Sequence, residues 1–289
     1  MTRQVRKAVF PVAGLGSRFL PATKVMPKEM LTLVDKPLIQ YAVEEARAAG
    51  VESFAFVTSQ GKTLIEDHFD SHYELYETLE RRGKEAELAS AKATEIAAGD
   101  LAIMRQHTPL GLGHAVWCAR DFIGNEPFAV ILPDDVILSK TPALKQMVDA
   151  YSKVGGNMVA VEEVPMEQVH RYGILDVDQD DGKIASAKGL VEKPNAEDAP
   201  SNLSIIGRYI LQPEIFDILD KRETGAGGEI QLTDAIAKMI GPMPFHGFRF
   251  DGTRYDCGNK AGFVAANVAF AMAREDVADD VRNMVKDLV

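Results

Sequence analysis

The sequence predicts an α/β fold in which a Rossmann-like, mostly parallel mixed sheet is flanked by helices and extended by antiparallel strands. Three observations indicate this. Apolar runs alternate with helical patterns through the first half, the first run ends in a glycine-rich turn, and strands follow one another closely in the second half. Strand–helix–strand order implies parallel pairing through right-handed crossovers, with ligands at the carboxyl ends of the strands.

Each element of the first half has its own signal. Short apolar runs predict strands at 8–12, 53–57, 101–105 and 128–132. A helix at 37–49 has Pro37 at its start and Gly50 after its end, the positions that proline and glycine favour at helix termini. Further helices are expected from about 62, over the Ala/Glu/Lys-rich stretch 74–97, and at 114–120.

The second half is less regular. Strands are expected at 157–163, 191–193 and 204–211, with a hairpin turn at 179–182. The stretch 263–289 is rich in Ala, Val and Met and predicts terminal helices. We therefore expect a catalytic domain over 1–262 and a helical tail over 263–289, which is a candidate oligomerisation element.

Composition excludes several classes of protein. In 289 residues, 46% are hydrophobic and 26% charged, as in a globular protein with a sizeable core. A net charge of −11 argues against binding to nucleic acid or an anionic membrane. Only Cys118 and Cys257 occur, so a disulfide framework or cysteine zinc site is not expected. Signal-peptide and membrane-spanning patterns are absent, so a cytoplasmic protein is expected.

A glycine-rich turn with clustered cations follows the first strand. Gly14 and Gly16 allow a tight bend that brings backbone N–H groups close to an anion. Arg18, Lys24 and Lys28 follow within one short segment of an otherwise acidic chain. Cations beside exposed amides stabilise a polyphosphate, so this turn is the candidate nucleotide site.

Other interpretations of the turn compete with this one. A dinucleotide-binding GxGxxG motif is broken by Phe19 and Pro21, which makes a dehydrogenase the weakest alternative, and a GxxxxGK[ST] motif is missing. A lone GxG is most often a structural turn with solvated charges. The combination of GxGSR, a proline and KxxPK directly after the first strand is more specific.

That combination resembles the signature GxGxR…P…PK of the sugar-nucleotide pyrophosphorylases. From about 7 to 271 the chain is similar to the bacterial UTP–glucose-1-phosphate uridylyltransferases of this family. The similarity lies in the stretches ATKVMPKEMLTLVDKPLIQY, GLGHAV, ILPDD, VEKP, GGEIQLTDAI and YDCGNK. Ser17 stands where many relatives have Thr, but the hydroxyl is kept.

The resemblance implies a nucleotide site along the turn and a neighbouring strand end. Arg18 and Lys28 would bind phosphates, Glu29 would lie near the nucleoside, and the backbone of Ala13 and Gly14 would face the base. Gln106 and Gly111 would contact uracil. A glutamine amide has both donors and acceptors, which suits a pyrimidine, although a lone Gln is often a surface residue. We expect His114 to be structural rather than catalytic.

Sugar and metal residues are implied in the same way. Glu192 would accept hydrogen bonds from sugar hydroxyls, Lys193 would bind the sugar phosphate, and the backbone of Gly173 would lie against the sugar. Asp134 and Asp256 match the family's metal positions, and carboxylates at strand ends suit Mg²⁺. Asp135 is more simply explained as a turn or helix-cap residue.

The reaction implied is direct, in-line attack of glucose 1-phosphate on UTP with Mg²⁺, giving UDP-glucose and pyrophosphate. Arg18, Lys28 and Lys193 would be the catalytic cations, because positioning and charge stabilisation are the enzyme's main tasks. Two alternatives stay open: a thymidylyltransferase for the same sugar phosphate, and a regulator that binds nucleotide sugars without turnover. A homodimer or homotetramer is expected.

Overall fold

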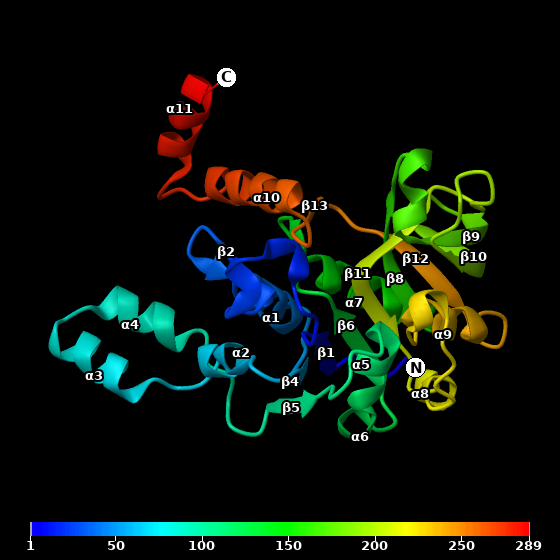
Figure 1. The fold of residues 1–289 in the computed structure, drawn as a ribbon, viewed down its shortest axis with the longest axis horizontal. Coiled ribbons are helices and arrows are strands. Elements are labelled where there is room, and N and C mark those ends of the chain that lie inside the picture. The colour runs from blue at the N-terminus through cyan, green and yellow to red at the C-terminus, as the bar shows by residue number, and fades with distance from the viewer. Residues whose placement is uncertain (1, 289) are drawn as a thin grey trace.

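One mixed β-sheet carries the fold. The computed structural model describes residues 2–288, and their main sheet has the strand order β5-β4-β1-β6-β11-β8-β12-β10-β9 (Figure 1). Its strands are β1 (Lys7–Pro11), β4 (Ser53–Thr58), β5 (Leu101–Arg105), β6 (Phe128–Ile131), β8 (Asn157–Glu163), β9 (Gly173–Asp180), β10 (Ile184–Glu192), β11 (Leu203–Leu211) and β12 (Phe245–Arg249). Two small sheets pair β2 (Thr32–Leu33) with β3 (Lys36–Pro37) and β7 (Asp135–Leu138) with β13 (Thr253–Asp256).

The two halves of the sheet differ in direction. β5, β4, β1 and β6 are parallel neighbours, which confirms the strands predicted in the first half. β11 is antiparallel to both β6 and β8, and β9 and β10 form an antiparallel hairpin. The hairpin turn lies where it is predicted, but the short strand expected at 191–193 is only the end of the longer β10.

Helices cover both faces of the sheet. They are α1 (Leu38–Ala48), α2 (Thr63–His68), α3 (Tyr73–Arg81), α4 (Glu85–Lys92), α5 (Leu112–Cys118), α6 (Arg120–Ile123), α7 (Ala143–Val154), α8 (Ile215–Leu219), α9 (Leu232–Met239), α10 (Lys260–Met272) and α11 (Ala278–Leu288). α7, α8 and α9 have no counterpart in the elements predicted above.

The core consists of two large apolar clusters, one on each face. Side chains alternate along β1, so Val9 points to one face while Ala8 and Phe10 point to the other. Val9 packs in the cluster that includes α5, α8 and α9, and Phe10 packs in the cluster that includes α1 and α7. This double covering explains why the parallel strands are continuous apolar runs.

The long helix predicted over 74–97 is wrong, because the chain forms two helices there. Gly83 adopts a positive φ of 65°, and the N–H of Lys84 donates to the carbonyl of Leu79 at 2.9 Å. These are the features of a Schellman C-cap, which ends α3 before α4 begins. Neither helix contains a buried residue, and the pair projects from the body of the molecule (Figure 1).

The C-terminal helices are present, but α10 begins earlier than predicted. The Asn259 side chain accepts a hydrogen bond from the N–H of Gly262 at 2.8 Å, which caps a helix that starts at Lys260. The predicted boundary at 262/263 thus falls inside α10. Ala266 and Phe270 pack with Leu33 of β2, whereas α11 projects beyond α10 (Figure 1). The two chain ends, Met1 and Val289, lie outside the described residues.

No helix between residues 2 and 288 has the length and apolar character that crossing a membrane requires.

His246 of β12 gives a prediction about stability and pH. Both of its ring nitrogens are buried without a hydrogen-bond partner among the described residues, and burial lowers the pKa of His246. Below the ordinary histidine pKa of about 6.5, the unfolded chain therefore binds the proton more readily than the folded one. We expect the free energy of unfolding to fall as the pH is lowered from 7.5 to 5.5.

Urea unfolding of the wild type and of His246→Phe at both pH values checks this. The wild type should lose more stability between the two pH values than the variant loses. Because His68 and His114 are present in both proteins, their contributions cancel in the comparison. An equal loss in the two proteins would contradict the prediction.

Candidate functional site

The carboxyl ends of the four parallel strands lie along one edge of the sheet. The chain leaves β1 through Ala13 and Gly14, leaves β5 through Gln106, and leaves β6 toward Asp134. Ala13 is buried, while Gly14 is exposed at the start of the turn. Loops that follow adjacent parallel strands form the usual ligand site of such sheets. The predicted nucleotide residues of these loops and Asp134 therefore lie along one edge of the sheet.

The turn after β1 requires glycine at position 16. Gly16 has a φ of 65°, and a Cβ there would lie 3.1 Å from Cβ of Lys28 and 3.3 Å from Cγ2 of Thr23. The Thr23 hydroxyl donates to the Gly16 carbonyl at 2.7 Å. The turn thus packs against the segment that carries Lys28. Arg18, which lies between Gly16 and Lys28 in the sequence, is exposed. Local geometry keeps the two predicted phosphate-binding cations on one loop.

Two carboxylates face these cations. Nζ of Lys28 lies 2.5 Å from Oδ2 of Asp134. A Cβ at Gly258 would lie 2.9 Å from Oδ1 of Asp256 and 3.0 Å from Oδ2 of Asp134, and the Arg18 guanidinium donates to the Gly258 carbonyl at 3.3 Å. The structure therefore brings together Arg18, Lys28, Asp134 and Asp256 around Gly258, where a side chain would crowd both acids.

Lys28 and Asp134 keep each other charged. Burial by itself lowers the pKa of Lys28, but the attraction of Asp134 and Glu29 outweighs it and the pKa is raised. Burial likewise acts to raise the pKa of Asp134, but the charge and hydrogen bond of Lys28 lower it overall. An ionised Asp134 is the form that a divalent cation requires.

The donor chemistry of the two acids fits a magnesium ion. Mg²⁺ usually takes one or two carboxylates and completes its shell with water and substrate phosphate. Among residues 2–288 no cluster of three or more His, Cys, Asp or Glu side chains is arranged to hold a metal. Asp134 and Asp256 supply carboxylate oxygens, the donor type that Mg²⁺ prefers.

Two residues near Asp256 were not predicted. Nδ2 of Asn259 donates to Oδ2 of Asp256 at 2.9 Å, and the Arg171 guanidinium lies 3.4 Å from the same oxygen. Asn259 also caps α10, and an asparagine directly before an apolar helix is a sequence signal that indicates this role. Arg171 has no such signal, because its contact depends on the approach of segments 85 residues apart.

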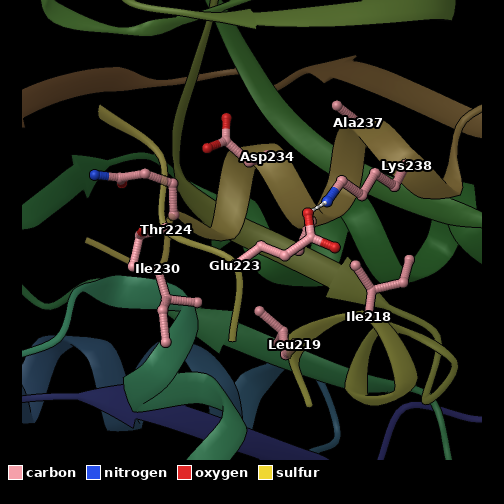
Figure 2. Close-up of a pocket in the computed structure, with 10 residues that line it drawn as sticks. Ile218, Leu219, Glu223, Thr224, Ile230, Asp234, Ala237 and Lys238 are labelled. Carbon is pink, nitrogen blue, oxygen red and sulfur yellow. Dashed lines mark hydrogen bonds and ion pairs between the residues drawn. The ribbon is translucent and has the colours of Figure 1, made fainter. Parts of the chain in front are cut away.

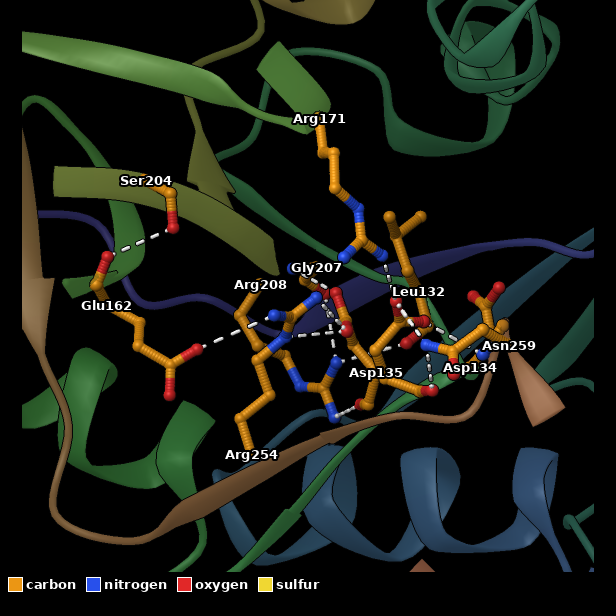
Figure 3. Close-up of polar contacts among 12 residues, drawn as sticks. Leu132, Asp134, Asp135, Glu162, Arg171, Ser204, Gly207, Arg208, Arg254 and Asn259 are labelled. Carbon is orange, nitrogen blue, oxygen red and sulfur yellow. Dashed lines mark hydrogen bonds and ion pairs between the residues drawn. The ribbon is translucent and has the colours of Figure 1, made fainter. Parts of the chain in front are cut away.

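Asp135 belongs to a buried network behind the site (Figure 3). Its Oδ1 accepts from Nε of Arg254 at 2.7 Å, and its Oδ2 accepts from the N–H of Gly207 at 2.8 Å. Arg208 donates to the carbonyl oxygens of Leu132 at 3.1 Å and of Asp135 at 2.7 Å. The interpretation of Asp135 as a turn or cap residue is therefore wrong. It is an ion-paired residue of β7, and Arg208 beside it holds the backbone carbonyls on both sides of Asp134.

Glu29 is a buried residue that pairs with Lys62. Its side chain is fully buried beneath the turn, where Oε2 lies 2.9 Å from Nζ of Lys62 and Oε1 has no partner among the described residues. That Glu29 lies near the nucleoside stays a prediction. Lys62 itself was missed, because a lysine at the start of a short helix gives no sequence signal of burial.

Gln106 and Gly111 meet, as expected of residues that share a base site. Nε2 of Gln106 lies 3.0 Å from the Gly111 carbonyl oxygen. Gly111 has a φ of 105°, and a Cβ there would lie 2.8 Å from the Ile230 carbonyl oxygen. Packing against the segment at 229–230 thus already requires glycine at this position. His114 lies in α5 and is buried beside Gln106, in agreement with a structural role.

The predicted sugar-phosphate residues form a second group. Gly173 of β9 pairs with Glu192 at the end of β10, and Nζ of Lys193 lies 3.1 Å from Oε1 of Glu192. A Cβ at Gly173 would lie 2.8 Å from Cδ1 of Ile205, so this position has no room for a side chain. Arg171, which reaches Asp256, lies two residues before Gly173. The predicted sugar-phosphate residues therefore lie close to the acids Asp134 and Asp256.

A separate cavity of about 380 Å³ lies between α8 and α9 (Figure 2). Figure 2 shows Glu223 and Lys238 as an ion pair at its rim, with Ile218, Leu219 and Ile230 around it. None of the residues predicted for the site lines this cavity. The chemistry expected from the sequence is thus located at the sheet edge rather than here.

Known proteins resemble this chain over most of its length. The family described as Nucleotidyl transferase matches residues 7–272, which include every predicted site residue. The chain belongs to the nucleotidyl transferase family.

Known relatives are similar to this nucleotidyl transferase over nearly their whole length. It is 56% identical to a UTP–glucose-1-phosphate uridylyltransferase from Komagataeibacter xylinus, over 90% of this chain and 92% of that protein. A UDP-glucose pyrophosphorylase solved with UDP-glucose is 44% identical, with a TM-score of 0.83 over 94% of this chain and 100% of its own. The UTP-bound UGPase from Acinetobacter baumannii is 39% identical, with a TM-score of 0.89 over 99% of this chain and 100% of its own.

Proposed function

We propose that this nucleotidyl transferase joins UTP and glucose 1-phosphate into UDP-glucose and pyrophosphate. The observation that carries the proposal is the cluster at the sheet edge, where Arg18 and Lys28 lie beside Asp134 and Asp256 around Gly258. It is supported by the names of relatives at 56% identity and by neighbours solved with UTP or UDP-glucose.

The residues would act by placing two anions in line. The phosphate of a sugar phosphate has a second pKa of about 6, so the group is mostly dianionic at neutral pH. Its oxygens are then competent to attack. Arg18 and Lys28 on the turn would bind the triphosphate, and Lys193 would bind the attacking phosphate. No covalent enzyme intermediate is needed, because attack at the α-phosphorus releases pyrophosphate directly. The chain's main task is to offset repulsion between the substrates.

Asp134 and Asp256 would hold Mg²⁺. When bound, this ion would supply positive charge to the phosphate oxygens of both substrates. Lys28 pairs with Asp134, so the lysine lies beside the acids. Glu29 would act indirectly, by holding Lys62 beneath the turn.

The function is tested by incubating the purified protein with Mg²⁺, UTP and glucose 1-phosphate and identifying the product by mass. UDP-glucose and stoichiometric pyrophosphate are expected. Binding of UDP-glucose without turnover would favour the regulator, and faster reaction with dTTP than with UTP would favour the thymidylyltransferase.

Replacing Lys193 by alanine is expected to impair the use of glucose 1-phosphate but not the binding of UTP. KM for glucose 1-phosphate should rise and kcat should fall by about 10²–10³, since the lysine would stabilise charge on the attacking phosphate. Calorimetric binding of UTP should stay within about twofold of wild type. The matched control is Lys188→Ala, an exposed lysine on β10, the strand that Lys193 directly follows, which should leave both constants unchanged. Unchanged glucose 1-phosphate kinetics in Lys193→Ala would remove it from the site.

We also propose that the protein works in the cytoplasm as a homodimer or homotetramer, with the helical tail as the contact. Val264 and Met272 on α10 and Met284 on α11 are large apolar side chains that remain exposed in the single chain. Light scattering on the purified protein distinguishes the monomer from either assembly.

A further inference from the structure

Gln106 is held by two groups that both accept hydrogen bonds. Its Nε2 lies 3.0 Å from the Gly111 carbonyl oxygen and 3.0 Å from Nδ1 of His114. A carbonyl oxygen only accepts, so the amide atom that faces it must be the nitrogen. The second N–H of that amide is then donated to His114, whose Nδ1 must be the unprotonated ring nitrogen.

Both acceptors are held firmly. The N–H of Ile230 donates to the Leu110 carbonyl at 2.7 Å, and the N–H of Gly113 donates to the Ile230 carbonyl at 2.8 Å, which anchors the loop on both sides of Gly111. His114 is 8% exposed and stacks on Trp117, with ring centroids 5.6 Å apart.

His114 is also kept in the state that can accept. Burial, and then the charge of Arg222, lower the pKa of His114, so the ring is neutral at pH 7. A neutral ring with an unprotonated Nδ1 carries its proton on Nε2.

The amide oxygen of Gln106 is therefore the atom left for a ligand. Both N–H groups are used within the protein, and no hydrogen bond to Oε1 occurs among the described residues. Gln106 follows β5 at the sheet edge, where its own N–H donates to the Thr58 carbonyl at 2.8 Å. An oxygen in this place can accept a hydrogen bond but cannot donate one.

We infer that His114 is a specificity-determining residue, which by accepting one N–H of Gln106 makes that side chain present an oxygen to the nucleotide base. Uracil and thymine carry a hydrogen on N3 and can donate to this oxygen, whereas N3 of cytosine is itself an acceptor and is repelled. The inference rests on the proposed function, since it deepens the recognition of UTP. It assigns rejection of cytosine to a positioning residue that does not itself touch the base.

Two substitutions distinguish the effect of the Gln106–His114 hydrogen bond from the effect of the packing of His114 on Trp117. His114→Phe keeps an aromatic ring against Trp117 but has no acceptor. His114→Asn loses the ring but places an amide oxygen close to where Nδ1 lies. The Kd values of UTP, CTP and dTTP are measured by calorimetry for both variants and the wild type, together with kcat/KM for each nucleotide with glucose 1-phosphate.

The wild type is expected to prefer UTP to CTP by about 100-fold or more. His114→Phe should lower this ratio by about tenfold, as expected for loss of one buried hydrogen bond, and His114→Asn should keep it within about threefold. The ratio of UTP to dTTP should change by less than about twofold in both variants, because both bases carry the N3 hydrogen.

The opposite pattern, in which Phe keeps the UTP/CTP ratio and Asn loses it, would show that His114 acts through packing and would overturn the inference. The same ratio in all three proteins would also overturn it, while formation of UDP-glucose would leave the proposed function standing. If the wild type neither binds UTP nor forms UDP-glucose, the proposed function fails first.

A measurement on the wild type keeps the inference testable if His114→Phe does not fold. Nitrogen-15 NMR of labelled histidine, assigned by the signal missing in His114→Asn, should show an unprotonated Nδ1 and a protonated Nε2. A proton on Nδ1 would overturn the inference, because His114 would then be a donor and could not hold the amide in this orientation.

Discussion

Asp134→Asn should lower kcat by about 10²–10³ at saturating UTP, glucose 1-phosphate and Mg²⁺, because a group aimed at charge in the transition state contributes this much. The substitution keeps the shape of the side chain but removes the charge that would hold the metal. It also keeps an oxygen for Lys28, which now lies 2.5 Å from Asp134. The protein should therefore stay folded at 25 °C, as circular dichroism can verify.

Binding of Mg²⁺ gives a second measurement that does not depend on turnover. Calorimetric titration with Mg²⁺ in the presence of UTP should show weaker binding in Asp134→Asn than in the wild type. Activity within twofold of wild type, or unchanged Mg²⁺ binding, would show that Asp134 is not a metal ligand.

The neighbouring acid supplies a matched control. Asp135→Asn makes the same chemical change one residue later, at a side chain that pairs with Arg254 in the interior. Removing one partner of a buried pair costs about 3–5 kcal/mol, so this variant should lose stability. Its folded fraction should retain more activity than Asp134→Asn. Comparing the two variants thus distinguishes a loss of catalytic activity from a loss of stability.

Arg208→Met is expected to lower the free energy of unfolding by about 3–5 kcal/mol, the loss that follows when one partner of a buried ion pair is removed. Arg208 is 1% exposed and donates to both carboxylate oxygens of Glu45, at 3.0 and 2.8 Å. It also donates to the carbonyl oxygens of Leu132, Gly207 and Asp135. Methionine leaves the Glu45 charge and these carbonyls without their partner, and urea unfolding measures the loss.

A surface arginine with the same geometry is the control for Arg208. Arg249 donates to both oxygens of Asp180 at 2.8 Å, but its side chain is 25% exposed, against 2% for Arg208. Arg249→Met should cost about 1 kcal/mol or less, because water replaces the lost partner. The double variant Glu45→Met/Arg208→Met should be more stable than Arg208→Met alone, since it removes the unpaired charge. A loss below about 1 kcal/mol in Arg208→Met would contradict this interpretation.

Local patterns in the sequence were sufficient for the parallel half of the sheet, the β9–β10 hairpin turn and the glycine bend. Buried strands such as β1 and β4 have unbroken apolar centres, and the bend at Gly16 depends on residues within twelve positions of it. The stretch 74–97 was predicted incorrectly, because its helical composition hides a break at Gly83. The backbone conformation at this glycine outweighs the propensity of its neighbours.

Candidate cations and acids were also identifiable from the sequence, because residue type and resemblance name them. The arrangement of these residues in space was not identifiable from the sequence. Lys28 and Asp134 are 106 positions apart, and they meet because β1 and β6 are adjacent in the sheet. The burial of Glu29 against Lys62, the ion pair of Asp135 and the orientation of the Gln106 amide depend in the same way on distant segments. Residue identity states what a side chain is able to do, whereas strand order and packing decide which partners it has, and only the folded chain contains that information.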